Sequence, residues 1–377
     1  MPPTLIKQIR TLYPNEHPIP LHRPVLGQRE KDLLVECVDS TFVSSVGEMI
    51  VEFERRVAEF CGAGHAVAVV NGTAGLQVAL RVAGVARDCE VITQALTFVG
   101  TCNAIAHAGA QPVFVDVERD TLGMSPEALR SFLEAHAERR DDGCYNRGSG
   151  RRIAGCMPMH TFGLPCRVNE IVAICDEWGI AVVEDAAEAL GSWREERHCG
   201  TFGRLGVFSF NGNKIITTGG GGMIVTDDED LARHARHLTT TAKRPHPYEY
   251  IHDEVGYNYR MPNLNAALGC AQMERLPGFL DSKCAIAERY RDFCSNHGLE
   301  FVESPAGCRT NHWLNAVILD SRAARDEFLE TTNAAGIMTR PIWRLMNELP
   351  MFEDCQRDGL ETSKWLEERV VNLPSSV

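Results

Sequence analysis

The chain has 377 residues, of which 44% are hydrophobic and 24% charged, and its formal net charge is −13 at pH 7. This length suits a large α/β domain with a smaller one rather than a single small core, and the composition is ordinary for a soluble globular protein. The acidic balance argues against a nucleic-acid partner and against an anionic membrane surface.

The cysteines, the histidines and the first residues narrow the class of protein further. Fourteen cysteines are spaced irregularly without a Cys-x-x-Cys pair, and thirteen histidines form no recognisable zinc motif, so we expect no metal site. Free thiols in this number fit a reducing cytoplasm. Residues 1–24 lack the apolar core of a signal peptide, and no apolar run approaches the ~18 residues of a membrane span. We therefore predict a cytoplasmic protein.

Short β-branched runs alternate with helical patterns between about residues 50 and 240. Strands are expected at 66–70, 90–93, 112–116, 153–159, 180–184, 205–210 and 222–226. Helices are expected at 74–85 and 99–107, and another begins at the acidic run Asp227–Asp230, whose charges suit a helix N-terminus. Continuous apolar strands separated by helices predict an α/β fold with a mostly parallel sheet covered on both faces.

The pattern changes after about residue 240. Residues 239–255 are polar, aromatic and rich in turn residues, which predicts a long loop of the kind that is functional or mobile. A helix is expected at 263–275, followed by charged helices at 283–297 and 322–335 and a strand at 313–319. We therefore predict an N-terminal arm and a large domain over residues 1–275, and a smaller C-terminal α+β domain over residues 276–377.

Two corners of the predicted sheet carry polar residues. Asn71-Gly72-Thr73-Ala74 follows a strand and opens a helix, where backbone N–H groups and the Thr73 hydroxyl can hold a phosphate. A corner of this type is more often only a tight turn. Asp185 ends the strand at 180–184, where open α/β sheets bind their ligands, but it could equally be the N-cap of a following helix.

Lys214 is the most informative residue of the chain. It lies in the glycine-rich run from Asn211 to Gly222, with Ser209 shortly before it and Asp185 further upstream. A lone lysine is most often a solvated surface residue. Together, however, an imine-forming lysine, a carboxylate that keeps a heterocyclic nitrogen protonated, and hydroxyl groups for a phosphate predict a pyridoxal phosphate (PLP) site. No P-loop or dinucleotide-binding fingerprint offers a competing interpretation.

Two further residues have open interpretations. Phe98, at the start of the helix expected at 99–107, can stack on the face of the cofactor ring, although a core phenylalanine is the commoner case. His160 is a candidate for substrate contact and as readily a structural residue.

Eight segments in order resemble the DegT/StrS family of PLP-dependent sugar aminotransferases, and the similarity runs from about Ile19 to Pro374. The segments are 43–47, 71–74, 96–98, 109–116, 184–191, 208–210 with Lys214, 256–261 and 265–269. Each segment alone is weak evidence, whereas the ordered series is specific. The resemblance implies the fold-type I aminotransferase architecture, with a large domain built on a mostly parallel sheet and a smaller C-terminal domain.

The resemblance also implies roles for single residues. Lys214 is then the catalytic lysine that binds PLP covalently, Asp185 holds the pyridine nitrogen, Glu188 lies near the phenolic oxygen, and Phe98 stacks on the ring. Four residues would then hold the phosphate: Gly72, Thr73, Ala74 and Ser209. Asn258 resembles a residue that reaches the phosphate of the neighbouring subunit, which implies a homodimer with shared active sites. In the loop at 239–255, a diphosphate can be contacted by Lys243, Arg244 and His246, although a merely solvated loop is equally compatible.

The glycine-rich run points to a substrate class. Where many relatives have Gly-Glu-Gly-Gly, this chain has Gly219 to Gly222, and the whole run from Asn211 is similar to members that act on UDP-linked N-acetylated 4-keto-6-deoxyhexoses in legionaminic acid and bacillosamine pathways. The resemblance thus implies amino transfer from glutamate to C4 of such a sugar in bacterial surface-glycan biosynthesis.

Three alternatives remain open at this stage. The first is another nucleotide-sugar aminotransferase, acting on a GDP- or dTDP-linked sugar with a C3 or C4 ketone. The second is a PLP-dependent dehydratase or lyase, although the dehydratase branch replaces the lysine with histidine and this chain has Lys214. The third is a protein that keeps the fold without turnover. The chain also stops at Val377, earlier than relatives usually end, so we expect the edge of the smaller domain to be truncated.

Overall fold

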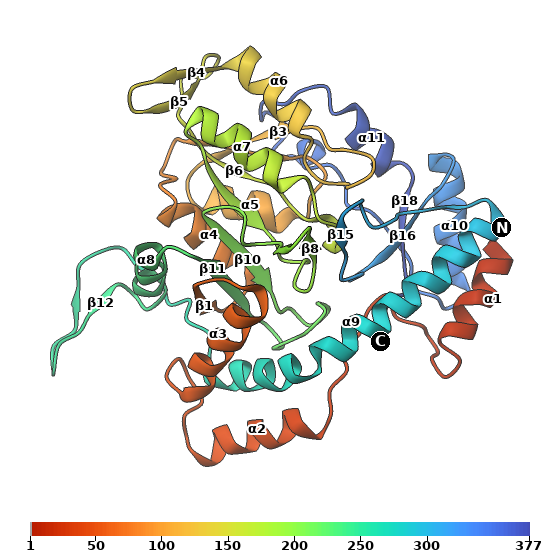
Figure 1. Ribbon diagram of the computed structural model, residues 1–377, viewed down its shortest axis with the longest axis horizontal. Coiled ribbons are helices and arrows are strands. Elements are labelled where there is room, and N and C mark those ends of the chain that lie inside the picture. The colour runs from red at the N-terminus through yellow and green to blue at the C-terminus, as the bar shows by residue number, and fades with distance from the viewer. Residues whose placement is uncertain (1) are drawn as a thin grey trace.

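Figure 1 shows the computed structural model, which describes residues 2–377. Its centre is a seven-stranded sheet with the strand order β1-β11-β10-β7-β6-β2-β3. The strands are β1 (His65–Val69), β2 (Glu90–Gln94), β3 (Gln111–Val115), β6 (Ile153–Met157), β7 (Ala181–Asp185), β10 (Leu205–Ser209) and β11 (Gly222–Thr226). Only β11 runs antiparallel to its two neighbours, while the pairs from β10 to β3 are parallel. The predicted mostly parallel sheet is confirmed.

Helices cover both faces of the sheet, because consecutive strand residues point to opposite sides and both sides are apolar. In β1, Val67 and Val69 pack in the core on the side of α4 (Gly72–Val82) and α8 (Glu229–Thr239). Ala66 and Ala68 pack in the core on the opposite side, which contains α3. The remaining helices of this region are α2 (Gln28–Asp39), α3 (Glu48–Cys61), α5 (Val99–His107), α6 (Pro126–His136) and α7 (Val168–Trp178).

A single long helix, α9 (Asn263–His297), stands where two helices were expected. Pro277 lies inside it, and proline normally ends or kinks a helix because it lacks an N–H group. Here Leu276 and Phe279 on either side of the proline pack in the large core and support the helix through this point. The helix therefore runs through the boundary predicted at residue 275, and Figure 1 shows it extending from α3 to the C-terminal sheet.

The C-terminal part is built on a four-stranded sheet with the order β14-β16-β18-β17. These strands are β14 (Glu300–Phe301), β16 (Asn315–Ile318), β17 (Arg340–Pro341) and β18 (Val370–Leu373), and α10 (Arg322–Ala334) lies beside them. Helix α1 (Pro2–Leu12), which the predicted division assigns to the first domain, buries Leu5 and Ile9 in the core of this second part. The division into domains at residue 275 stays a prediction.

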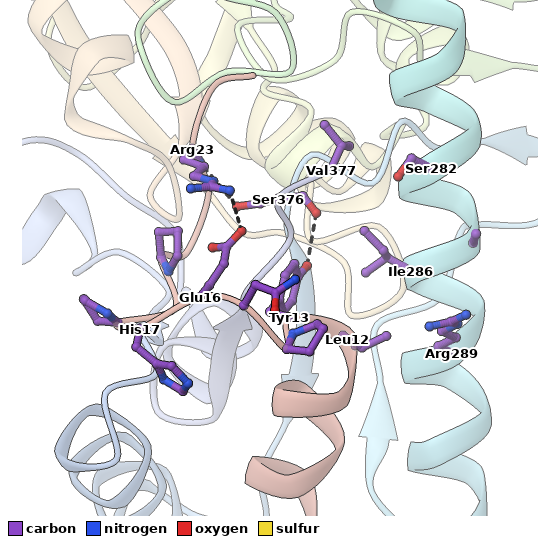
Figure 2. Close-up of a pocket in the computed structure, with 15 residues that line it drawn as sticks. Leu12, Tyr13, Glu16, His17, Arg23, Ser282, Ile286, Arg289, Ser376 and Val377 are labelled. Atoms are coloured by element: carbon purple, nitrogen blue, oxygen red, sulfur yellow. Dashed lines mark hydrogen bonds and ion pairs between the residues drawn. The ribbon is translucent and has the colours of Figure 1, made fainter. Parts of the chain in front are cut away.

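The segment after α1 crosses from this second part toward the large sheet. Tyr13 donates through its hydroxyl to the carbonyl oxygens of Pro374 and Ser376, and Arg23 pairs with Glu16 at 2.7 Å. A cavity of about 710 Å³ beside α9 is lined by Tyr13, Glu16, Arg23 and Ser376, among others (Figure 2). The cavity has no glycine-rich corner and none of the predicted site residues.

A second connection joins the C-terminal part to β3. Phe114 donates its amide to the carbonyl oxygen of Gln356 at 2.9 Å, and Asp358 donates to Phe114 at 3.1 Å, so this segment adds to the edge of the large sheet. The Asp116 carboxylate then accepts the amides of Thr362 and Ser363 at the start of α11 (Glu361–Glu367). The two parts are therefore tied at α9 and again at this edge.

The loop expected at 239–255 contains a small hairpin of β12 (Lys243–Arg244) and β13 (Ile251–His252). It projects from the body beside α8 (Figure 1), and its aromatic side chains Tyr248 and Tyr250 are exposed. The remaining short strands are β4 (Ala137–Arg140), β5 (Gly143–Asn146), β8 (Trp193–Arg194), β9 (Arg197–His198) and β15 (Cys308–Arg309). Within residues 2–377, no helix has the length and apolar character of a membrane span.

Candidate active site

A cavity of about 300 Å³ opens at the carboxyl ends of β7 and β10, beside the N-terminus of α4. Open α/β sheets bind ligands at this edge because strand ends and helix N-termini meet there. Seven of the residues singled out in the sequence line the cavity together: Gly72, Thr73, Phe98, Asp185, Glu188, Ser209 and Lys214.

The start of α4 forms an anion cradle. Asn71 caps the helix by accepting the amide of Ala74 at 2.8 Å, and the first-turn amides of Gly72 and Thr73 have no acceptor inside a helix. Ser209, at the end of β10, lies so close that a Cβ atom on Gly72 would be 3.0 Å from the Ser209 Cβ. Backbone amides, a helix dipole and hydroxyl groups here suit a phosphate. The amide of Ala74 is bonded to Asn71, so a contact of Ala74 with the phosphate stays a prediction.

Asp185 is a buried carboxylate at the end of β7, with 3% of its surface exposed. Its Oδ2 accepts the Thr101 hydroxyl at 2.7 Å and its Oδ1 accepts the Ala187 amide at 3.1 Å. Burial raises the pKa of Asp185, while Thr101, Ala187 and Lys214 act in the opposite direction. The N-cap interpretation is wrong, because residues 186–191 form turns and no helix. A protonated ring nitrogen fits the carboxylate, since the cavity places no cation in hydrogen-bond contact with it.

Lys214 is held from two sides inside the cavity. Its Nζ lies 3.0 Å from Glu188 Oε1 and 3.9 Å from the centroid of the Trp313 ring. Glu188 is buried, and its second oxygen accepts the amide of Phe162 at 2.9 Å. Burial raises the pKa of Glu188, and the neighbouring Lys214 lowers it. The interpretation of Lys214 as a solvated surface lysine is wrong, since its side chain is largely enclosed.

Aromatic side chains form the remaining wall. Phe98 is 50% exposed and lines the cavity, so it is no core residue. Its ring lies edge-on to Trp343, with centroids 6.2 Å apart, and Trp343 also contacts Phe162 at 5.1 Å. Trp313 and Trp343 were not predicted. Both come from the C-terminal part, and no local pattern in the sequence links a tryptophan there to a strand end far upstream.

Other predicted residues lie away from this cavity. His160 is fully buried, its Nε2 lies 2.9 Å from Glu184 Oε2, and it does not line the cavity, which favours the structural interpretation; its contact with the substrate stays a prediction. Lys243 and Arg244 are exposed on β12 and line no part of the cavity in the same chain. His246 and Asn258 also lie outside the cavity. Asn258 is exposed and forms a β-bridge with Thr240.

The arrangement fits PLP, although the structure contains no ligand. The cradle of Gly72, Thr73 and Ser209 suits the phosphate, and the buried Asp185 suits the pyridine nitrogen. Phe98 lines the same cavity with an aromatic ring. No cluster of three or more metal-ligating side chains occurs in the described part of the chain.

Comparison with known proteins agrees with this geometry. Residues 24–377 match the DegT/DnrJ/EryC1/StrS aminotransferase family. The chain is 37% identical over 334 residues to the putative pyridoxal phosphate-dependent aminotransferase EpsN of Bacillus subtilis, covering 88% of this chain and 83% of EpsN. It is 34% identical over 356 residues to the GDP-perosamine synthase of Caulobacter vibrioides, covering 93% and 91% of the two chains.

A solved structure agrees in fold as well. The structure of DesI in the presence of its TDP-sugar product superimposes with a TM-score of 0.83 at 28% identity, covering 97% of this chain and 91% of DesI. With the family match and the fit of the cavity, these similarities show that the chain belongs to the DegT/DnrJ/EryC1/StrS family and is a PLP-dependent aminotransferase.

Proposed function

We propose that the protein transfers the amino group of glutamate to C4 of a UDP-linked 4-keto-6-deoxy-N-acetylhexosamine, in the biosynthesis of a bacterial surface glycan. The observation that carries the reaction is Lys214, enclosed between Glu188 and Trp313 in one cavity with Asp185 and the anion cradle. A nucleotide-linked substrate is supported by the relatives named for GDP-perosamine and for a TDP-sugar product. The identity of the sugar and its nucleotide is supported only by the sequence of the run from Asn211 to Gly222. A GDP- or dTDP-linked keto sugar is the alternative substrate.

The residues of the cavity have separate roles in this proposal. Bound PLP supplies an electron sink for the negative charge that develops at the substrate carbon. Asp185 keeps the ring nitrogen protonated, and the amides of Gly72 and Thr73 fix the phosphate. Lys214 is the group that moves protons at the substrate carbon through its Nζ, and the carboxylate of Glu188 at 3.0 Å orients that amine.

We propose further that the enzyme is a cytoplasmic homodimer with shared active sites. Several exposed apolar side chains lie on α2, on α3 and in the segment between them: Val35, Val38, Phe42, Val46 and Val51. A second copy is the occupant that suits such a surface, since contiguous exposed apolar residues mark association sites. In the dimer, Asn258 and the projecting hairpin would contribute to the cavity of the other subunit, with Lys243, Arg244 and His246 near the diphosphate.

The test begins with the visible absorption of the PLP-loaded protein before and after addition of L-glutamate. We expect glutamate to remove the visible band and to form 2-oxoglutarate in stoichiometric amount, and we expect the Lys214→Ala variant to do neither. Matched UDP-, GDP- and dTDP-linked keto sugars, added to the glutamate-treated enzyme, then identify the acceptor by return of the band. A band indifferent to glutamate would remove the donor from the proposal and favour lyase or dehydratase chemistry.

A further inference from the structure

A buried turn of the C-terminal part, residues 311–313, supports the group that faces Lys214. Asn311 donates through its side-chain amide to the carbonyl oxygens of Glu188 at 2.7 Å and Leu190 at 2.9 Å, and its Oδ1 accepts the amide of Trp313 at 2.9 Å. His312 has a φ angle of +47°, in the left-handed region that non-glycine residues rarely adopt. Contacts around the turn must therefore hold it in this conformation.

A second set of contacts to the turn comes from Lys283 on α9. Its Nζ donates to the carbonyl oxygens of Ser375 at 2.6 Å, Trp313 at 3.0 Å and His312 at 3.3 Å, and its side chain is 1% exposed. No carboxylate within residues 2–377 forms an ion pair with it. Three acceptors require three N–H donors, which only the ammonium form provides.

The two histidines near Lys283, His22 and His312, do not supply a positive charge to these carbonyl oxygens at neutral pH. Burial lowers the pKa of Lys283 to about 7. Burial and the charges of Lys283 and Lys214 together lower the pKa of His22 well below its ordinary value, so its ring stays neutral. Burial, Arg291 and Lys283 lower the pKa of His312 to about 4. Lys283 is therefore the charged group of this cluster toward the acidic side of pH 7, where its ammonium donates to the three carbonyl oxygens.

We propose that Lys283 is a positioning residue for Lys214, because its ammonium fixes the turn at 312–313 and the turn sets the Trp313 ring against the lysine amine. The inference rests on the proposed role of Lys214. Trp313 makes two contacts that depend on its position: its ring faces the Lys214 Nζ at 3.9 Å, and its Nε1 donates to the carbonyl oxygen of Asn213 at 2.6 Å. A positive charge at Nζ is stabilised by the face of an indole ring. Displacing the ring therefore weakens protonation at that atom and frees the backbone before it.

The test compares Lys283→Met with Lys364→Met. Lys364 also donates to a carbonyl oxygen, that of Gly359 at 3.0 Å, but it is exposed and remote from the cavity, so it is a matched control. The readout is the pH midpoint of the visible absorption change of the PLP-loaded protein. We expect the midpoint of Lys283→Met to fall by about 0.5 to 1 pH unit, from the loss of the cation–π contact, while Lys364→Met keeps the wild-type midpoint.

A double-variant cycle separates positioning from general damage to the fold. Trp313→Leu should lower the midpoint by a similar amount, and Lys283→Met with Trp313→Leu should lower it no further, because both changes remove the same contact. Additive shifts, or a wild-type midpoint in Lys283→Met, would overturn the inference. If Lys283→Met does not fold, Trp313→Leu alone tests the contact with Lys214, and a wild-type midpoint in that variant would overturn the inference. A wild-type protein without any PLP-dependent band would instead refute the proposed function.

Discussion

The hydrogen bond from Thr101 to Asp185 should control how tightly the protein binds its cofactor. Thr101 is buried, and its hydroxyl donates to Asp185 Oδ2 at 2.7 Å. Valine has almost the same shape without the hydroxyl, so Thr101→Val removes this donor and leaves the Ala187 amide as the remaining contact of the carboxylate. The substitution also removes the contact of Thr101 with the Thr97 hydroxyl, which is why a control at Thr97 is needed.

The expected size follows from the type of bond. A hydrogen bond to a charged group contributes about 1.5–3 kcal/mol, and its loss raises the pKa of Asp185. Burial already raises this pKa, so both effects favour the protonated carboxyl group. A carboxyl group that is protonated in part stabilises a protonated ring nitrogen less well, so we expect the dissociation constant of PLP to increase about tenfold or more.

The assay is a titration of cofactor-free protein with PLP, followed by visible absorption at several pH values between 5 and 9. The dissociation constant of Thr101→Val should increase most at the acidic end. Thr97→Val is the control, since the Thr97 hydroxyl contacts Thr101 and not Asp185, and its effect should be smaller. Equal PLP affinity for wild type and Thr101→Val across this range would refute the idea that the bond sets the charge of Asp185.

Three further outcomes follow from the structure. Gly72→Ala places a Cβ atom 3.0 Å from the Ser209 Cβ and should weaken PLP binding about tenfold through the phosphate; unchanged affinity in the PLP titration would contradict the cradle. Burial lowers the pKa of Lys283 to about 7 in the folded protein, below the ~10.4 of the unfolded chain, so the unfolded chain binds more protons between these pH values. The free energy of unfolding of wild type should therefore rise with pH by about 1.4 kcal/mol per unit relative to that of Lys283→Met. Urea denaturation at pH 7 and 9 measures this rise, and an equal pH dependence in both proteins would contradict it. Glu54 accepts the Ala68 amide at 2.7 Å and pairs with Arg236 and the buried Arg260. Glu54→Ala should therefore lower the free energy of unfolding by about 3–5 kcal/mol, measured by the shift of the urea midpoint. A loss below ~1 kcal/mol would mean that water replaces the carboxylate.

The parts of the site that follow strand ends could be predicted from the sequence. Asp185 and Ser209 each end a strand whose β-branched residues identify it, and parallel neighbours bring their ends to one edge of the sheet. The corner at Asn71 follows a third strand by the same logic. Each of these residues was found from a local pattern.

The parts that depend on distant contacts could not be predicted. Trp313 reaches Lys214 through a turn that contacts from Lys283 and Asn311 support, and none of these residues carries a local sign of this arrangement. The continuity of α9 through Pro277 is decided by packing on both sides of the proline, against the intrinsic preference of that residue. The sequence left His160 open between a substrate contact and a structural role, because its burial beside Glu184 depends on the packing of the strands and loops around it.

The double attachment of the C-terminal part has a consequence for how the enzyme selects its substrate. Trp343 lies on a short span whose ends are both fixed: Ile342 donates to Val370 in the small sheet at 3.1 Å, and Met346 donates to Ala95 at the large sheet at 3.0 Å. With α9 and the β3 edge also joined, a hinge rotation of one part against the other would break several of these bonds at once. The aromatic wall is therefore shaped before any sugar arrives, and binding loses little conformational entropy in forming it. A preformed wall of this kind discriminates between sugars by steric fit when they first enter the cavity. Sugars of the wrong shape should therefore have a low association rate constant, rather than bind and then dissociate quickly.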